Sequence, residues 1–478
     1  MAGRFLNLFK PIARFIPEIK APERRVSFNE KLFWTAIALI IYLVMAGIPL
    51  YGIPPEIQES FAPLRIIFAS NRGTLMELGI GPIVTAGLIL QLLVGSAMIE
   101  CDMSKPEDRA LFTTASKVFA IILTGVQASA YIISGMYNPP GGTLPGTTTI
   151  IIFLQLLAAG FIVLLLDELV QKGWGFGSGI SLFIMAGVAQ HIFIQCFDIT
   201  PADVPWRSNG IFVALVQTIM RGEPLTGLLL RGNFPSIVGL VATIAAFLVI
   251  IYMEGVRVEL PLSYAGYRGF RSRYPIKLLY VSNLPVIFAS ALFANIYFFS
   301  YILWSQPWGK NNFWVNLLGW YKEENIGNRV QHVPAGGLVY YVTSPGNLSN
   351  VMAEPLRAFG YLTILVAFCI IFSLIWLEVG GLGPSTVAKQ LVDAGMQIPG
   401  YRRSGKAVEQ ILKRYIPAVT VLGGIIVGLI AGLSDFFGVF GSGTGILLSV
   451  GIIYQYYEIL VRERAAEMYP AFRRIFGG

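Results

Sequence analysis

Apolar residues along this chain occur in long runs that contain no acidic or basic side chain. A helix of about 20 apolar residues crosses a membrane. Runs free of Asp, Glu, Lys and Arg lie at 32–55, 78–99, 118–166, 173–197, 232–253, 278–309, 358–377, 415–434 and 436–457. The run 118–166 contains turn residues at 138–142 (Asn-Pro-Pro-Gly-Gly) and 145–146 (Pro-Gly), so it holds two helices. The pattern therefore predicts ten membrane-spanning helices and an all-α fold.

Composition agrees with this interpretation. The 478 residues are 55% hydrophobic and 13% charged, whereas a soluble domain carries roughly 25% charged residues. These values exclude a soluble globular protein and a disordered chain. Three scattered cysteines, Cys101, Cys196 and Cys369, indicate neither a disulfide framework nor a metal site. The first apolar run is too long for a signal peptide, so we expect no cleavable leader.

Ten spans place both termini on one side of the membrane. If that side is the cytoplasm, its segments are 1–31, 100–117, 167–172, 254–277, 378–414 and 458–478, and they hold 26 of the 35 Lys and Arg residues. The positive-inside rule then predicts cytoplasmic termini. Segment 1–31 is either a membrane-surface amphipathic helix or an ordinary basic tail.

The spans offer little for covalent chemistry. No ionisable acid or base lies in the ten apolar cores, and the two histidines, His191 and His332, show no ligand spacing. No phosphate-binding Gly-x-x-x-x-Gly-Lys-Ser/Thr motif occurs. We expect no enzyme activity and no cofactor. A solute transporter would need ionisable or converging polar groups near the midplane, and an intramembrane enzyme a nucleophile or metal ligands, so both alternatives are disfavoured.

Two short motifs recur five spans apart. Residues 81–87 (Gly-Pro-Ile-Val-Thr-Ala-Gly) resemble 284–290 (Leu-Pro-Val-Ile-Phe-Ala-Ser), and 177–180 (Gly-Ser-Gly-Ile) resembles 441–446 (Gly-Ser-Gly-Thr-Gly-Ile). An odd offset inverts the topology, so the chain is predicted to contain two inverted halves, 32–197 and 232–457. The linker 198–231 includes a run at 208–220 that is too short to cross and is predicted to be interfacial. Residues 54–72 are either a re-entrant half-helix or a surface loop.

These motifs resemble those of the SecY family, the pore subunit of the Sec protein-conducting channel. The matching segments are 78–85, 167–169, 177–184, 274–277, 282–285 and 441–445, and the resemblance extends from about Ala21 to Tyr454. The segment 280–283 and residues 288–296 resemble the archaeal branch. The resemblance implies a passive channel that passes unfolded secretory chains and releases hydrophobic segments sideways into lipid.

The resemblance also implies functional positions. A ring of branched aliphatic side chains at the waist would comprise Ile80, Val84, Ile180, Ile184, Ile287 and Leu448. A lateral gate between spans two and three and spans seven and eight would carry Thr85, Gln127 and Asn283. A plug at 56–72 would include Ile57, Phe61, Leu64, Arg65, Ile67 and Phe68.

Charged positions and partners follow from the same resemblance. Ribosomal RNA phosphates would be bound by Arg268, Arg271, Arg273, Lys277, Arg402, Arg403 and Lys406. Signal sequences would be oriented by Arg65, Arg72 and Glu378. The implied partners are the ribosome, nascent chains with their signal sequences, membrane lipid, and two small single-span subunits, the gamma/E-type clamp and the beta subunit. The expected location is the archaeal plasma membrane, or the endoplasmic reticulum if the chain is eukaryotic.

Overall fold

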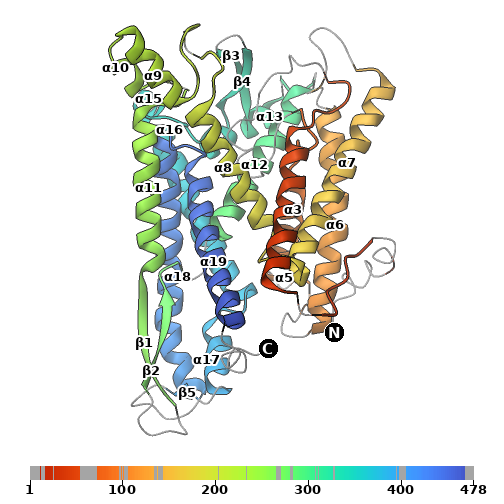
Figure 1. Cartoon of the computed structure of the whole chain (residues 1–478), viewed down its shortest axis with the longest axis vertical. Helices are drawn as coiled ribbons and strands as arrows, with labels where there is room; N and C mark the ends of the chain where they lie inside the picture. The colour runs from red at the N-terminus through yellow and green to blue at the C-terminus, as the bar shows by residue number, and fades with distance from the viewer. Residues whose placement is uncertain are drawn as a thin grey trace.

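The computed structural model of the chain is predominantly helical (Figure 1). It describes residues 11, 17–24, 26–53, 73–95, 98–99, 101, 106–133, 137, 144–202, 204–232, 234–264, 271–279, 284–306, 308–310, 312–326, 329–393, 396–397 and 405–468. Residues 1–10, 12–16 and 25 of the N-terminal segment 1–31, and the whole of the plug proposed at 56–72, lie outside this set.

Ten helices of the described residues overlap the nine apolar runs of the sequence, two of them in the run 118–166. They are α3 (Phe28–Gly47), α5 (Gly81–Gly95), α6 (Pro106–Ile133), α7 (Gly146–Leu169), α8 (Gly179–Phe197), α11 (Ile237–Gly255), α12 (Leu284–Ser305), α16 (Pro355–Val379), α18 (Gly405–Phe436) and α19 (Gly443–Met468). Nine of them are, with their extensions, long and apolar enough to cross a membrane, and α5 is a shorter apolar helix. The predicted ten-helix fold is confirmed.

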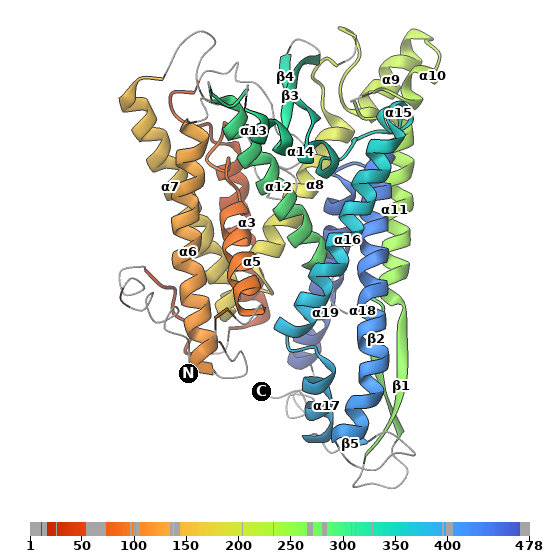
Figure 2. The ribbon, with the colours of Figure 1, turned by 180° about the vertical axis from the view of Figure 1, so that it is seen from behind.

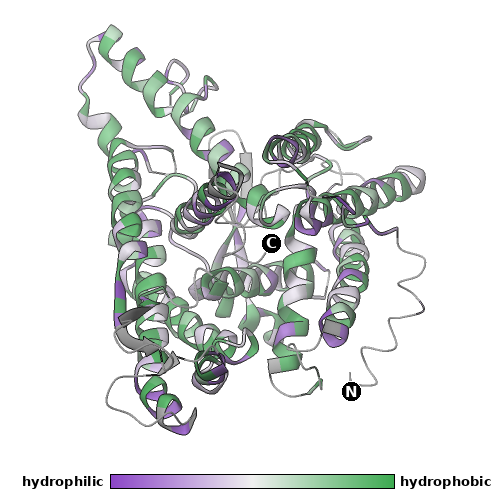
Figure 3. Ribbon diagram, turned by 60° about the horizontal axis from the view of Figure 1, so that its bottom comes forward, coloured by the Kyte–Doolittle hydropathy of each residue, from purple (hydrophilic) through white to green (hydrophobic). Residues whose placement is uncertain are grey.

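The first five and the last five helices form two groups that stand side by side (Figures 1 and 2). The groups meet where α8 and α3 pack against α19, and where α5 packs against α12 and α16. Hydrophobic residues cover most of the helix lengths, while hydrophilic residues gather at helix ends and connections (Figure 3). This distribution is expected of helices whose sides contact lipid or one another.

Both described ends of the bundle lie on the same side. Lys31, at the start of α3, forms an ion pair with Glu463 near the end of α19, with Nζ and Oε1 2.7 Å apart. Lys277 pairs with Glu458 of α19 at 3.3 Å. An even number of crossings requires this arrangement.

Apart from α9, which overlaps the apolar run 208–220, the connections contain structure that hydropathy did not predict. On the side of the described termini, strands β1 (Arg257–Tyr264), β2 (Arg271–Lys277) and β5 (Met396–Gln397) form an antiparallel sheet in the order β2-β1-β5, with Arg257 opposite Lys277, beside helix α17 (Pro384–Asp393). On the opposite side, β3 (Trp320–Ile326) pairs with β4 (Arg329–Gly336). The remaining connections hold η1 (Val170–Trp174), α9 (Ile211–Arg221), α10 (Thr226–Leu229), α13 (Phe313–Leu318), α14 (Leu338–Val342) and α15 (Leu348–Ala353).

Candidate functional site

Six aliphatic side chains from both halves share one buried cluster. Ile80, in the turn before α5, Ile184 on α8 and Leu448 on α19 are each at most 2% exposed. Val84, Ile180 and Ile287 are partly buried and pack against the same cluster. These are the six positions predicted for the ring, and they come from α8, α12, α19 and the start of α5. The cluster also contains many ordinary packing residues, so membership alone does not define a pore.

The chemistry of these six side chains is uniform. They carry no charge and no hydrogen-bonding group, so they can block ions by excluding water when they are close together. Among the described residues, no group of three or more His, Cys, Asp or Glu side chains is arranged to hold a metal ion. The six side chains have the chemistry of a physical barrier to ions.

A hydrogen bond joins α5 to α12 beside this cluster. The Nδ2 amide of Asn295 donates to the Thr85 hydroxyl at 3.2 Å and to the carbonyl of Ala291 at 2.7 Å. Thr85 is buried, and Gln127 on α6 is half-buried. Asn283, predicted as the third member, lies outside the described residues.

Sequence reasoning therefore missed Asn295. An amide side chain in an otherwise apolar span is a signal for an interhelical hydrogen bond, and that signal was present in the run 278–309. One turn further along α12, the ring of Phe298 lies 4.8 Å from the ring of Tyr131 on α6. Asn295 and Phe298 share a helix face, so α12 presents both groups toward α5 and α6.

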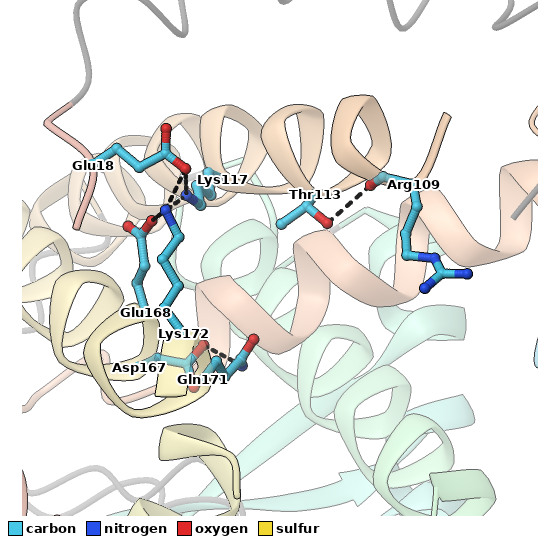
Figure 4. Close-up of polar contacts among 8 residues, drawn as sticks. All are labelled: Glu18, Arg109, Thr113, Lys117, Asp167, Glu168, Gln171 and Lys172. Atoms are coloured by element: carbon cyan, nitrogen blue, oxygen red, sulfur yellow. Dashed lines mark hydrogen bonds and ion pairs between the residues drawn. The ribbon is translucent and has the colours of Figure 1, made fainter. Parts of the chain in front are cut away.

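A second polar site connects the N-terminal segment to α6 and to the end of α7 (Figure 4). The buried carboxylate of Glu168 lies 2.7 Å from the amines of both Lys117 and Lys172. Glu18 also pairs with these two lysines. The hydrogen bond from Lys172 is the main reason that the pKa of Glu18 is lowered from its usual 4.5.

The predicted basic residues divide between described and undescribed regions. Arg271 and Arg273 lie on β2, and Lys277 ends that strand with its amine 5.1 Å from the ring centre of Tyr454. Lys406 is exposed at the start of α18. The remaining basic positions, Arg268, Arg402 and Arg403, lie outside the described residues.

The charges proposed to orient signal sequences are also divided. Glu378 is exposed near the end of α16. Arg65 and Arg72 lie outside the described residues, as do the plug positions Ile57, Phe61, Leu64, Ile67 and Phe68.

Ten apolar helices in two groups, with an apolar cluster shared between them, define a polytopic membrane protein. Residues 74–457 match the family model SecY, and residues 40–73 match that of the plug domain of Sec61p. The protein translocase subunit SecY of Pyrococcus horikoshii is 43% identical over 477 residues, covering 97% of this chain and 98% of the relative.

Solved structures agree. The structure of a protein conducting channel superposes with a TM-score of 0.80 at 37% identity, covering 97% of this chain and 98% of the other. Sec61 in the canine ribosome-channel complex from the endoplasmic reticulum gives 0.77 at 37% identity, with the same coverage. The chain belongs to the SecY family. It is a multi-pass membrane channel through which unfolded polypeptides cross the membrane and hydrophobic segments leave sideways into the bilayer.

Proposed function

We propose that Ile80, Val84, Ile180, Ile184, Ile287 and Leu448 form the constriction of this channel. The observation that carries the proposal is their shared apolar cluster, which draws on both halves of the chain. Branched aliphatic side chains form no specific hydrogen bonds, so they can yield around any translocating side chain and then exclude water again. The channel is passive and performs no covalent chemistry, and an external motor drives the polypeptide.

The lateral gate is the contact of α5 and α6 with α12. The Thr85–Asn295 hydrogen bond and the Tyr131–Phe298 ring contact support this assignment, because both cross from one half to the other. Such bonds between membrane helices are weak, about 0.6 kcal/mol on average. A hydrophobic signal segment can therefore replace them with its own contacts. Gln127 adds a polar group on the α6 side.

The hairpin β1–β2 and the start of α18 are proposed as the ribosome-binding surface, together with the loop residues Arg268, Arg402 and Arg403. Arg271, Arg273, Lys277 and Lys406 supply positive charge there, and rRNA phosphates are the complementary surface. A relative of similar fold is found in a ribosome-channel complex. This side of the bundle would then be cytoplasmic, with both termini, in an archaeal plasma membrane.

The plug at 56–72 would close the opposite side, and Arg65, Arg72 and Glu378 would orient signal segments. Two single-span subunits, of the gamma/E and beta types, would complete the complex. The family match to a plug domain over 40–73 supports the first of these assignments.

The linker between the halves is proposed to lie in the membrane interface. Helix α9 buries Ile211 and Ala214 but exposes Phe212, Val216 and Ile219. The ring of Phe212 lies 5.4 Å from that of Phe197 at the end of α8, so the exposed apolar face continues from a spanning helix onto α9. Helices with one apolar face suit the headgroup boundary.

Site-specific photocrosslinking tests the central path. A crosslinker at Ile184 or Leu448 is expected to capture a secretory chain that is stalled on a ribosome. The control position is Leu248 on α11, which is 62% exposed on the outside of the bundle. Crosslinks at both ring positions with none at Leu248 support the proposal. A chain that crosslinks at neither ring position, while still being translocated, contradicts it.

A further inference from the structure

Two carboxylates, one buried (Asp167) and one half-buried (Asp435), occupy equivalent places in the two halves. Asp167 lies in the last turns of α7, and Asp435 lies in the last turn of α18. Each of these helices directly precedes a ring-bearing helix, α8 or α19. The ion-pair cluster of Figure 4 uses the neighbouring Glu168 and not Asp167, and nothing in the proposed channel function uses either aspartate.

Each carboxylate accepts a hydrogen bond from the backbone at the start of the following helix. Asp167 Oδ1 accepts from the N–H of Ile180 at 2.9 Å. Asp435 Oδ1 accepts from the N–H of Gly443 at 2.6 Å. The carboxylates are themselves held, because Gln171 donates to Asp167 and the Tyr361 hydroxyl donates to Asp435 at 2.8 Å.

The turns that bring these groups together share a left-handed glycine and differ at the serine that follows it, because Ser442 has a φ of 65° whereas Ser178 is extended, with a φ of −116°. Gly177 and Gly441, two residues before the helices begin, both adopt left-handed backbone angles, with φ of 66° and 75°. Gly179 and Gly443 both lack room for a side chain. A Cβ at Gly179 would lie 2.6 Å from Asp167 Cα, and one at Gly443 would lie 2.1 Å from the carbonyl oxygen of Ala431. The start of each ring-bearing helix is thus in backbone contact with the end of the preceding helix.

These hydrogen bonds cap the N-terminal ends of the two ring-bearing helices. The first N–H groups of a helix have no partner within the helix, and the positive end of its dipole favours an anion. Ser178, which precedes α8, makes no capping bond with its side chain. Asp167 therefore supplies the cap from a different helix, which fixes both the height and the rotation of α8. Ile180, whose N–H is bound, is itself a proposed ring residue.

We propose that Asp167 and Asp435 are positioning residues that set the placement of the ring side chains, one for each half. Asp167 acts at the start of α8, where the Tyr456 hydroxyl of α19 also donates to the carbonyls of Phe176 and Ser178. Asp435 acts at the start of α19. The inverted halves thus anchor their ring helices from opposite sides of the membrane. This inference rests on the proposed function in one respect only, which is that displaced ring side chains are expected to let ions leak if the ring is the constriction.

The test uses cysteine reporters at Ile180 and Leu448 in a channel whose native cysteines, Cys101, Cys196 and Cys369, are replaced. Reactivity toward a small thiol reagent is measured on the purified full-length protein in vesicles. Asp167→Ala is expected to raise the reactivity at position 180 by about tenfold and leave position 448 within about twofold, because bonds to a carboxylate are among the strong ones. Asp435→Ala is expected to do the reverse.

Conservative variants separate positioning from a general loss of stability. Asp167→Asn keeps an acceptor oxygen and is expected to restore wild-type reactivity at position 180. Glu168→Gln changes a neighbouring buried carboxylate that pairs with Lys117 and Lys172, and it is expected to leave both reporters unchanged. If Asp167→Ala does not fold, Asp167→Ser, whose hydroxyl is too short to reach α8, replaces it.

The outcomes are distinct. Selective reactivity at the reporter of the same half, with rescue by Asn, supports the proposal. Equal changes at both reporters, or no change at either, overturn it. Ion leak through the same vesicles is recorded in parallel. Selective reactivity without leak retains the positioning role and contradicts the proposed constriction instead.

Discussion

Loss of the Thr85–Asn295 hydrogen bond is expected to lower the hydrophobicity that a segment needs to leave the channel. Thr85→Val removes the acceptor while keeping the shape of the side chain. Asn295 keeps its bond to the Ala291 carbonyl at 2.7 Å, so no buried amide is left without an acceptor. The substitution therefore isolates the contact between α5 and α12.

The magnitude follows from the geometry. A neutral bond of 3.2 Å between two membrane helices is worth about 0.6 kcal/mol, with a maximum near 1.7. The smaller value is about a threefold change in the ratio of open to closed gate. One leucine in a spanning segment contributes about the same free energy on the insertion scale. The variant is therefore expected to insert a marginal segment that contains about one leucine fewer than the wild-type channel requires.

The assay is a series of model segments with increasing leucine content, scored for insertion against full translocation. Thr124→Val is the matched control, because the buried Thr124 hydroxyl donates to Ala120 within its own helix at 2.8 Å. Combining Thr85→Val with Asn295→Leu completes a double-mutant cycle. An unchanged midpoint for Thr85→Val, or one that moves toward more leucine, refutes the interpretation of this bond as a latch.

Two further predictions concern the same framework. Gly443→Ala is expected to destabilise the channel by several kcal/mol, because its Cβ would lie 2.1 Å from the Ala431 carbonyl oxygen and the helices must move apart. Thermal unfolding measures this loss of stability. The control is Gly255→Ala, which has open space around it and should leave the stability unchanged. Protonation of Glu18 at acidic pH is expected to break its ion pairs with Lys117 and Lys172 and to release the N-terminal segment. The pKa of Glu18 is lowered, chiefly by Lys172, so the pairing is complete above the usual 4.5 and is lost as pH falls through the lower folded-state value. Protection of 17–24 against hydrogen exchange, taken relative to the intrinsic exchange rate at each pH, should fall as the pH is lowered below 4.5. Glu18→Gln should give the same loss of protection at pH 7, and equal protection at neutral and acidic pH would contradict the prediction.

Hydropathy predicted the ten helices because charge is excluded from lipid whatever the tertiary contacts are. It failed for the connections. The strands β1 and β2 pair through backbone bonds between Arg257 and Lys277 and their neighbours, and such pairing in a polar, aqueous segment leaves no apolar run to detect. The Gly-Ser-Gly repeat was visible in sequence. The structural reason for the repeat was not visible, because Asp167 and Asp435 lie beside it only when the chain has reversed direction between two helices.

The candidate site shows the same division. The six ring residues are apolar residues among many, and the family resemblance selected them rather than their pattern. Asn295 was detectable from sequence alone as an amide in an apolar run, because a polar atom in lipid requires a partner. Asn283, the position that the resemblance selected, lies outside the described residues, so its role stays a prediction.

The interfaces inside one half and between the halves differ in kind, and this difference explains how a gate can open without unfolding the bundle. Within the second half, Gly424, Gly428 and Gly432 form a stripe on α18 against α16, and a Cβ at Gly428 would lie 2.9 Å from the Cα of Val366. Backbones in such contact gain packing that no flexible side chain can replace. Across the gate, side chains make the contact, through a hydrogen bond and an aromatic pair. Contacts of that kind can be exchanged for those of an incoming segment, so we expect the halves to separate as rigid bodies while each keeps its close-packed helices.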